Sequence, residues 1–191
     1  PGRAQVVVGR SGQHLAPAER FEPAVACRGR RRGVQDLDGT LVDSVYQHVL
    51  AWREATQKEG IELPVWKIHR QIGMSGGLML SALARETGRR VSPELAERIQ
   101  RAHAESYAKQ APSLRVLPGT RELLNTLATH RVPHAIATSG RLRSAAHALK
   151  LLDLRTGVPV ITRDDVRFAK PDPDLFLSAV ERLGVPMSRC V

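Results

Sequence analysis

The chain has 191 residues, 42% hydrophobic and 25% charged, which is ordinary for a folded protein and fits one domain with a small insertion. No apolar run reaches the length of a membrane span and no segment reads as a secretion signal. The only two cysteines, Cys27 and Cys190, lie at opposite ends and do not suggest a disulfide framework. We therefore expect a cytoplasmic protein without membrane contact.

The net charge of +10 is concentrated near the N-terminus. Residues 1–33 hold seven arginines against two glutamates, and Gln5 to Val8 is their only strand-like stretch. The run from Arg28 to Gly33 has two interpretations: an arm that binds a polyanion, or a poorly patterned extension that includes residues from an incorrect start or reading frame. Because no aromatic residue is interleaved with these arginines to stack on bases, we favour the extension and expect no nucleic-acid partner.

A strand is predicted to end at Asp36, but the residues before it are unusual. A central parallel strand should be almost wholly apolar, and between Arg30 and Gln35 only Val34 fits. Burying the arginines at 30–32 would carry a large desolvation cost, so we expect them to lie outside the sheet.

Residues 45–112 are predicted to be helical throughout. Val45, Val49 and Trp52 form an apolar stripe on the first helix, which we interpret as packing. Ser92 is a typical N-cap for the last helix. The expected helices span 45–60, 65–72, 78–87 and 92–110, with a flexible glycine-rich turn at 73–77.

After Pro118 and Gly119 the pattern changes to alternating helices and strands. Asp172 is expected to cap the last helix, with Pro173 at its first position. The expected helices span 120–129, 141–151 and 172–183, and the expected strands span 134–138, 157–162 and 189–191. This alternation predicts an α/β fold with a parallel, doubly wound sheet.

The nine residues from Asp36 to Ser44 carry the strongest chemical signal. Asp36 and Asp38 are two apart, so along a strand both side chains point to the same side, at the carboxyl end where open α/β sheets bind ligands. Gly39 permits a sharp turn, and Asp43 or Ser44 can cap the following helix. One acid can be a nucleophile and the other a proton carrier, and the pair can hold Mg²⁺.

Two later segments also bear chemistry. A predicted strand ends in Thr138, Ser139 and Gly140, a hydroxyl pair and a glycine that can hold a phosphate oxygen. Lys170, one of only five lysines, can neutralise a phosphate and keep Asp36 ionised. The seven histidines do not cluster at metal-ligand spacing, and we interpret all of them as surface or core residues.

Together these segments resemble the haloacid dehalogenase-like (HAD) hydrolases, in particular the phosphoglycolate phosphatase and β-phosphoglucomutase subgroup. The string from Asp36 to Ser44 resembles the first motif of the family, the strand ending at Thr138 the second, and Lys170 with Pro171 the third.

The resemblance implies a Rossmann-like, three-layer parallel-sheet core with an inserted all-helical C1 cap. The core would comprise residues 34–44 and 113–191, the cap residues 45–112, and the basic extension residues 1–33.

The resemblance also implies a Mg²⁺-dependent hydrolysis of a small phosphomonoester. Asp36 attacks phosphorus and forms an aspartyl-phosphate, Asp38 carries the proton, and Thr138 and Lys170 hold the phosphoryl group. Mg²⁺ binds the carboxylate of Asp36 and the backbone carbonyl of Asp38. The further candidate substrate contacts are Gly39, Thr40, Ser139 and Gly140 in the core and Arg70 and Gly73 in the cap.

The sequence departs from the family at two places. The fourth motif, an acidic loop that supplies more metal ligands, would follow the strand that begins near Val191, and the first strand is too polar. We therefore expect a core that is incomplete at both ends. Two alternatives stay open: a truncated or non-catalytic HAD-like protein, and a sugar-phosphate mutase, which the motifs do not separate from a hydrolase.

Overall fold

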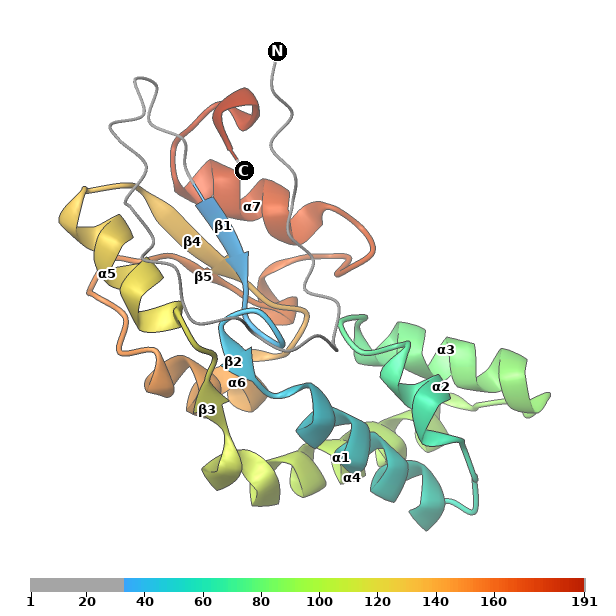
Figure 1. Ribbon diagram of the computed structural model, residues 1–191. Coiled ribbons are helices and arrows are strands. Elements are labelled where there is room, and N and C mark those ends of the chain that lie inside the picture. The colour runs from blue at the N-terminus through green and yellow to red at the C-terminus, as the bar shows by residue number, and fades with distance from the viewer. Residues whose placement is uncertain (1–32, 191) are drawn as a thin grey trace.

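The computed structural model describes residues 33–190, so the expected strand at Gln5 to Val8 and the arginine run before Gly33 lie outside the described residues. A three-stranded parallel sheet runs through the larger part of the molecule (Figure 1). Its strands stand in the order β1 (Gly33–Asp36), β4 (His134–Ala137) and β5 (Val160–Ile161). The expected parallel sheet and α/β fold class are confirmed.

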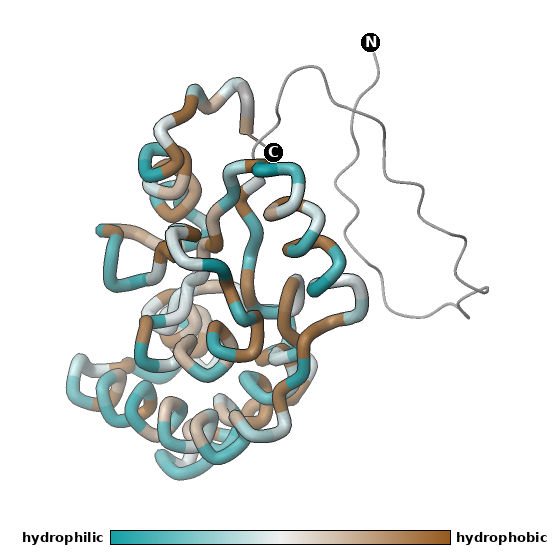
Figure 2. Tube along the Cα trace, turned by 90° about the vertical axis from the view of Figure 1, so that its left-hand side faces the viewer, coloured by the Kyte–Doolittle hydropathy of each residue, from teal (hydrophilic) through white to brown (hydrophobic). Residues whose placement is uncertain are grey.

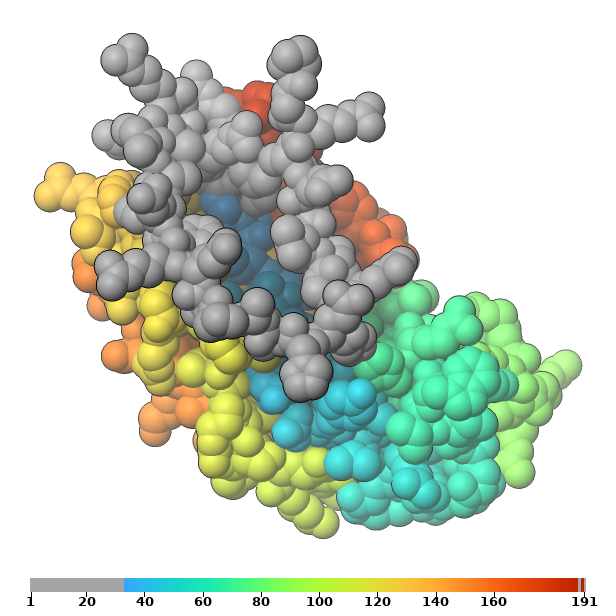
Figure 3. All heavy atoms as spheres, in the orientation of Figure 1, coloured from blue at the N-terminus to red at the C-terminus, as the bar shows by residue number. Residues whose placement is uncertain are grey.

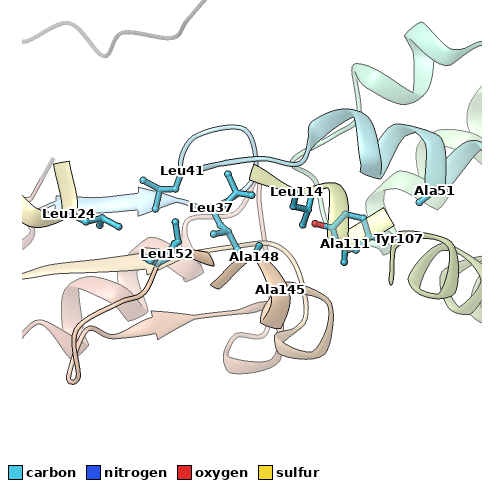
Figure 4. Close-up of a cluster of buried hydrophobic side chains, with 12 residues drawn as sticks. Leu37, Leu41, Ala51, Tyr107, Ala111, Leu114, Leu124, Ala145, Ala148 and Leu152 are labelled. Carbon is cyan, nitrogen blue, oxygen red and sulfur yellow. The ribbon is translucent and has the colours of Figure 1, made fainter. Parts of the chain in front are cut away.

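Helices cover both faces of this sheet (Figure 1). Side chains alternate across a strand, so Ile136 packs toward α5 (Thr120–Thr129) and α6 (Leu142–Leu151), while its neighbours in β4 pack toward α7 (Asp174–Arg182). Figure 4 shows Leu37 and Leu41, from the loop after β1, beside Leu152 and Ala148 in the first of these clusters. The loop that carries the two aspartates is therefore anchored in the hydrophobic core.

Strand β1 forms despite its polar sequence. It pairs with β4 from Gly33↔His134 to Asp36↔Ala137, and it stands at one edge of the described sheet. All four of its residues are half-buried. Gln35 is half-buried, and its side-chain oxygen has no hydrogen-bond partner among the described residues, whereas β4, in the middle, is wholly buried and apolar after His134.

The helical segment, residues 45–110, consists of α1 (Val45–Lys58), α2 (Val65–His69), α3 (Gly76–Thr87) and α4 (Pro93–Gln110). It forms a lobe beside the sheet, teal to green in Figure 3. Brown and teal alternate along its helices in Figure 2, and their apolar faces meet in a separate core. The fully buried members of that core include Val49, Ala55, Ile68 and Ile99.

The chain enters and leaves the helical segment through one narrow connection. The short strands β2 (Val42–Asp43) and β3 (Arg115–Val116) pair antiparallel there, and a 3₁₀ helix at Ala111–Ser113 precedes β3. The backbone carbonyl of Leu41 accepts hydrogen bonds from the Leu117 N–H at 2.9 Å and the Thr120 hydroxyl at 2.9 Å. The two crossing strands are thereby tied to the core.

Several expected boundaries are corrected. Helix α3 begins at Gly76, inside the expected flexible turn, and α2 ends at His69. Helix α7 begins at Asp174, and Pro173 precedes it without a side-chain cap, so Asp172 is not its cap. A 3₁₀ helix at Met187–Arg189 replaces the first residue of the expected final strand, and another lies at Arg163–Asp165. Ser92 caps α4 as expected, accepting from Leu95 N at 3.2 Å.

No helix between residues 33 and 190 is both long enough and apolar enough to cross a membrane.

Candidate active site

The loop after β1 turns sharply and leaves both aspartates at the carboxyl end of the sheet. Leu37 is fully buried between them, and its backbone carbonyl accepts from Leu41 N at 3.0 Å. Gly39 has φ of +73°, and a Cβ there would lie 2.7 Å from Val45 Cγ2. Only glycine satisfies both conditions, so this position fixes the turn that brings Asp38 beside Asp36.

Asp36 and Lys170 form a close ion pair. Lys170 Nζ lies 2.6 Å from Asp36 Oδ2, and the two side chains are 16% and 32% exposed. The other carboxylate oxygen of Asp36 accepts from Leu37 N at 2.8 Å. Lys170 follows the buried Ala169, which packs under the sheet against α7. The Asp36 carboxylate is therefore held in one orientation by a cation and a backbone N–H.

Asp38 is held by three side chains. Ser44 Oγ donates to its Oδ1 at 2.6 Å, His48 Nε2 lies 3.3 Å from the same oxygen, and Thr138 Oγ1 donates to Oδ2 at 3.2 Å. Burial raises the pKa of Asp38, but the hydrogen bond and charge of His48 and the two hydroxyl hydrogen bonds outweigh it, so the pKa lies below its ordinary value. The Ser44 hydroxyl therefore fixes the Asp38 carboxylate. Ser44 stands at the N-cap position of α1, but its side chain does not cap that helix.

Thr138 and Ser139, the hydroxyl residues that follow β4, differ in their hydrogen bonds. Thr138 is fully buried, and its hydroxyl also accepts from Gly140 N at 3.0 Å. The Ser139 hydroxyl is buried and has no hydrogen-bond partner among the described residues. A buried polar group without a partner costs free energy, so Ser139 Oγ is ready to accept one from a ligand.

Two histidines extend the hydrogen bonds of Asp38 into the helical segment. His48 Nδ1 in α1 lies 3.2 Å from His103 Nε2 in α4. The His48 ring stacks on Tyr107 with 3.9 Å between centroids, and the His103 ring stacks on Trp52 at 4.1 Å. Burial, and after it a charge on His48, lower the pKa of His103 to about 3. Burial likewise raises the pKa of Tyr107.

A cavity of about 180 Å³ lies between the carboxyl end of the sheet and the helical segment. Its core side carries Asp36, Asp38 and Lys170 together with Arg141 and Arg163, and its helical side carries apolar and carboxamide groups. The side chains on the helical side include Trp52, Gln71, Ile72, Met74, Gln100 and His103. The arrangement places two carboxylates and three cations around one small cavity.

A larger cavity of about 460 Å³ lies at the amino end of the sheet, beside His134 at the start of β4 and Pro159 just before β5. Its acidic side chain, Asp153, stands among four arginines, at positions 121, 131, 155 and 182. We assign the site to the smaller cavity, because that cavity combines the paired carboxylates with Lys170.

Comparison with known proteins agrees with this geometry. Residues 34–191 match a protein family described as haloacid dehalogenase-like hydrolase. The chain belongs to the HAD-like hydrolases. Within this family it is 31% identical over 160 residues to "Phosphorylated carbohydrates phosphatase" of Thermotoga maritima, covering 82% of this chain and 72% of that protein. It is 28% identical over 165 residues to "Beta-phosphoglucomutase" of Bacillus subtilis, covering 81% and 70%.

The same membership is seen in three dimensions. This HAD-like hydrolase superimposes with a TM-score of 0.81 on the crystal structure of a hydrolase from Pseudomonas syringae, at 49% identity, covering 84% of this chain and 74% of that one. The resemblance inferred from the motifs and the Rossmann-like fold that it implied are both confirmed.

The structure brings most of the expected site residues of this HAD-like hydrolase together. Six line the cavity: Asp36, Asp38, Gly73, Ser139, Gly140 and Lys170. Thr138 lies directly behind the cavity wall, bonded to Asp38. Gly39 and Thr40 are exposed and lie outside the cavity lining, as does Arg70, whose guanidinium lies 5.9 Å from the centre of the Trp66 ring.

Sequence reasoning missed the residues that the helices contribute. His48 and Trp52 are four apart, so they share one face of α1, and this spacing after the first motif was the available signal. Interpreting every histidine as a surface or core residue was wrong for His48, which contacts Asp38. His103 approaches from a helix distant in sequence, and no local pattern could have assigned it.

The two aspartates supply oxygen donors, the kind of ligand that Mg²⁺ prefers. Between residues 33 and 190 no group of three or more histidine, cysteine, aspartate or glutamate side chains is placed to hold a metal ion. The donors in the described part of the chain therefore fit Mg²⁺ in chemical type but form only part of a coordination shell.

Proposed function

We propose that this chain is a phosphatase that removes phosphate from a small phosphomonoester through a phosphoryl group carried on Asp36. The observation that supports this most directly is the ion pair of Asp36 and Lys170, 2.6 Å apart, beside Asp38 in one cavity. The cation lies against one oxygen of the proposed nucleophile and can neutralise an incoming phosphate.

In the first step, a carboxylate oxygen of Asp36 bonds to phosphorus while the bond from phosphorus to the leaving oxygen breaks. The Leu37 N–H and Lys170 Nζ fix the carboxylate at both oxygens before substrate binds. Little reorganisation is then needed to reach the reactive geometry.

Asp38 carries the proton in both steps. It gives a proton to the leaving oxygen, and afterwards it takes one from the water that attacks the phosphorylated Asp36 and releases inorganic phosphate. Its lowered pKa favours the ionised form in the free protein, and the approach of a phosphate dianion, a like charge, raises its proton affinity. Ser44, His48 and Thr138 fix its position.

The transferring phosphoryl group is held by Lys170 and by the Ser139 hydroxyl, which has no partner among the described residues. Thr138, whose hydroxyl is bonded to Asp38, acts as a positioning residue. The sequence assigned the phosphoryl contact to Thr138; the proposal assigns the direct hydroxyl contact to Ser139 instead.

Mg²⁺ is the proposed cofactor, held by the Asp36 carboxylate and the Asp38 backbone carbonyl, with water and phosphate oxygens as further ligands. When bound, it neutralises charge on the transferring phosphoryl group.

We propose that the helical segment is a cap that selects the leaving group. The cavity of about 180 Å³ is too small for a large substrate. Gln71 and Gln100 can hydrogen-bond hydroxyl groups, and Trp52 offers an apolar edge. A phosphorylated carbohydrate, the substrate class named for the Thermotoga relative, fits this wall.

Two alternatives have a specific observation behind them. The similarity to β-phosphoglucomutase favours a mutase, which would return the phosphoryl group to another hydroxyl instead of water. The partial set of metal donors between residues 33 and 190 favours a non-catalytic HAD-like protein.

One experiment separates the three. The purified chain is incubated with 4-nitrophenyl phosphate and with a sugar phosphate, with Mg²⁺ or EDTA, and products are followed by phosphorus NMR. A phosphatase releases inorganic phosphate in step with substrate loss. A mutase forms an isomeric sugar phosphate, and a non-catalytic protein changes neither substrate.

A further inference from the structure

A chain of hydrogen bonds connects the proposed proton carrier to the second helix of the cavity wall. Asp38 Oδ1 lies 3.3 Å from His48 Nε2, and His48 Nδ1 lies 3.2 Å from His103 Nε2. His103 itself lines the cavity but does not reach either aspartate. The hydrogen-bonded route from His103 to Asp38 therefore passes through His48.

The bonding partners assign a direction to this chain. A carboxylate only accepts hydrogen bonds, so His48 Nε2 must carry a hydrogen to bond Asp38. When His48 is neutral, its lone pair lies on Nδ1, and His103 Nε2–H is the donor that matches it. Without that donor, only the hydrogen bond to Asp38 would hold the proton on Nε2 and the ring in this orientation, one partner instead of two.

Aromatic stacking holds the planes of the two imidazoles but not their protons. The His48 and Tyr107 planes are 8° apart and the Trp52 and His103 planes 20° apart, so each ring rests on a flat neighbour. Phenylalanine would stack equally well, without the cost of enclosing a polar ring. Packing alone thus explains an aromatic residue at position 103; it does not explain two ring nitrogens that face each other.

We propose that His103 is a positioning residue: it holds His48 in the tautomer that donates to Asp38, and so keeps the proton carrier oriented toward the leaving oxygen. This inference rests on the proposed role of Asp38. It parallels metal sites, in which a second hydrogen bond to a histidine fixes its tautomer and ring orientation.

Two substitutions separate positioning from packing. His103→Phe keeps a flat ring against Trp52 and removes the donor, whereas His103→Gln loses the ring and keeps an amide N–H at about the reach of Nε2. Positioning predicts that His103→Gln retains more activity than His103→Phe; packing predicts the reverse order. His147→Phe, at an exposed position of α6, is the matched control and should behave as the wild type.

The leaving group supplies a second readout. 4-Nitrophenolate departs without a proton, whereas an alkoxide needs one, and kcat/KM reports the step in which the leaving group departs. His103→Phe should lower kcat/KM about tenfold or more for an alkyl phosphate, within the 10–100-fold range seen for such supporting hydrogen bonds, and clearly less for 4-nitrophenyl phosphate. Equal losses on both substrates would overturn the proposal.

A measurement without turnover keeps this test separate from the proposed function. Nitrogen-15 NMR of the imidazoles distinguishes a protonated Nε2 from a protonated Nδ1. We expect His48 to be the Nε2–H tautomer in the wild type and in His103→Gln, and a mixture in His103→Phe. An unchanged His48 spectrum in a folded His103→Phe protein would refute the positioning role, whether or not the chain is a phosphatase.

Discussion

Lys170 Nζ lies 2.6 Å from Asp36 Oδ2, although the two residues come from opposite ends of the described chain. Parallel pairing accounts for the approach: β1 and β4 end at the same sheet edge, and Lys170 precedes the helix that packs beneath them. Both side chains are largely shielded from water, so the pair interacts more strongly than one on an open surface.

Replacing Lys170 with methionine should reduce kcat/KM about a hundredfold or more, because the cation that faces the developing charge is lost while the aliphatic stem remains. Steady-state kinetics with 4-nitrophenyl phosphate would measure this. Lys150→Met, at an exposed position of α6, is the control. A loss of only a few-fold at Lys170 would show that the residue does not serve the reaction.

The hydrogen bond from Ser44 to Asp38 should appear as a coupling energy. Ser44→Ala should lower the free energy of unfolding by about 1.5–3 kcal/mol, the range for a hydrogen bond to a charged group. In an Asp38→Asn background the same substitution should cost clearly less, because the charged acceptor is gone. Urea unfolding of the four proteins gives the coupling, and additive losses would argue against this bond.

Gly39 and Gly77 offer a matched pair of glycines. Gly39→Ala should destabilise the chain by at least about 1–2 kcal/mol and reduce activity, because φ is +73° and the new Cβ would meet Val45. Gly77 lies in α3 with nothing within 4 Å of an added Cβ, so Gly77→Ala should be neutral or stabilising. Thermal unfolding measures both, and equal effects would contradict the assigned geometry.

Asp165 should make stability depend on pH. The hydroxyl and backbone of Thr162, and then Arg182, hold the pKa of Asp165 below its ordinary value. The stability that ionised Asp165 contributes is therefore fully present above the ordinary carboxyl pKa, near 4. It is lost as the pH falls through the lower pKa of Asp165 in the folded protein.

Asp165→Asn should accordingly cost about 1 kcal/mol at pH 7 and progressively less toward pH 3. Urea unfolding across this range measures the difference, with the exposed Asp172→Asn as the control. A cost that grew on acidification would reverse the assigned direction.

The sequence predicted the position of the two aspartates because their arrangement is local. Strand alternation predicted both carboxylates at the carboxyl end of the sheet; the strand itself ends at Asp36, and the turn at Gly39 brings Asp38 to the same end. Lys170 was recognisable because lysine is scarce and a proline follows it. The alternating pattern after Gly119 likewise predicted the parallel sheet, although the observed β5 is shorter than expected.

The helical side of the site was less accessible to prediction, because its contacts join distant segments. Ser44 has the sequence of a helix cap, but its hydroxyl donates to Asp38 and makes no capping hydrogen bond. Arg70 was expected to be a substrate contact of the cap, yet its guanidinium lies over Trp66. His48 and His103 come into hydrogen-bonding distance only because α1 packs on α4.

The measurement that tests the central claim most directly is phosphate release by the wild type and by Asp36→Asn, each with Mg²⁺ and with EDTA. We predict Mg²⁺-dependent release by the wild type, lost with EDTA, and a fall of a thousandfold or more in Asp36→Asn with its fold retained by circular dichroism. Phosphate release that survives Asp36→Asn, or a folded wild type that releases none, would contradict the account.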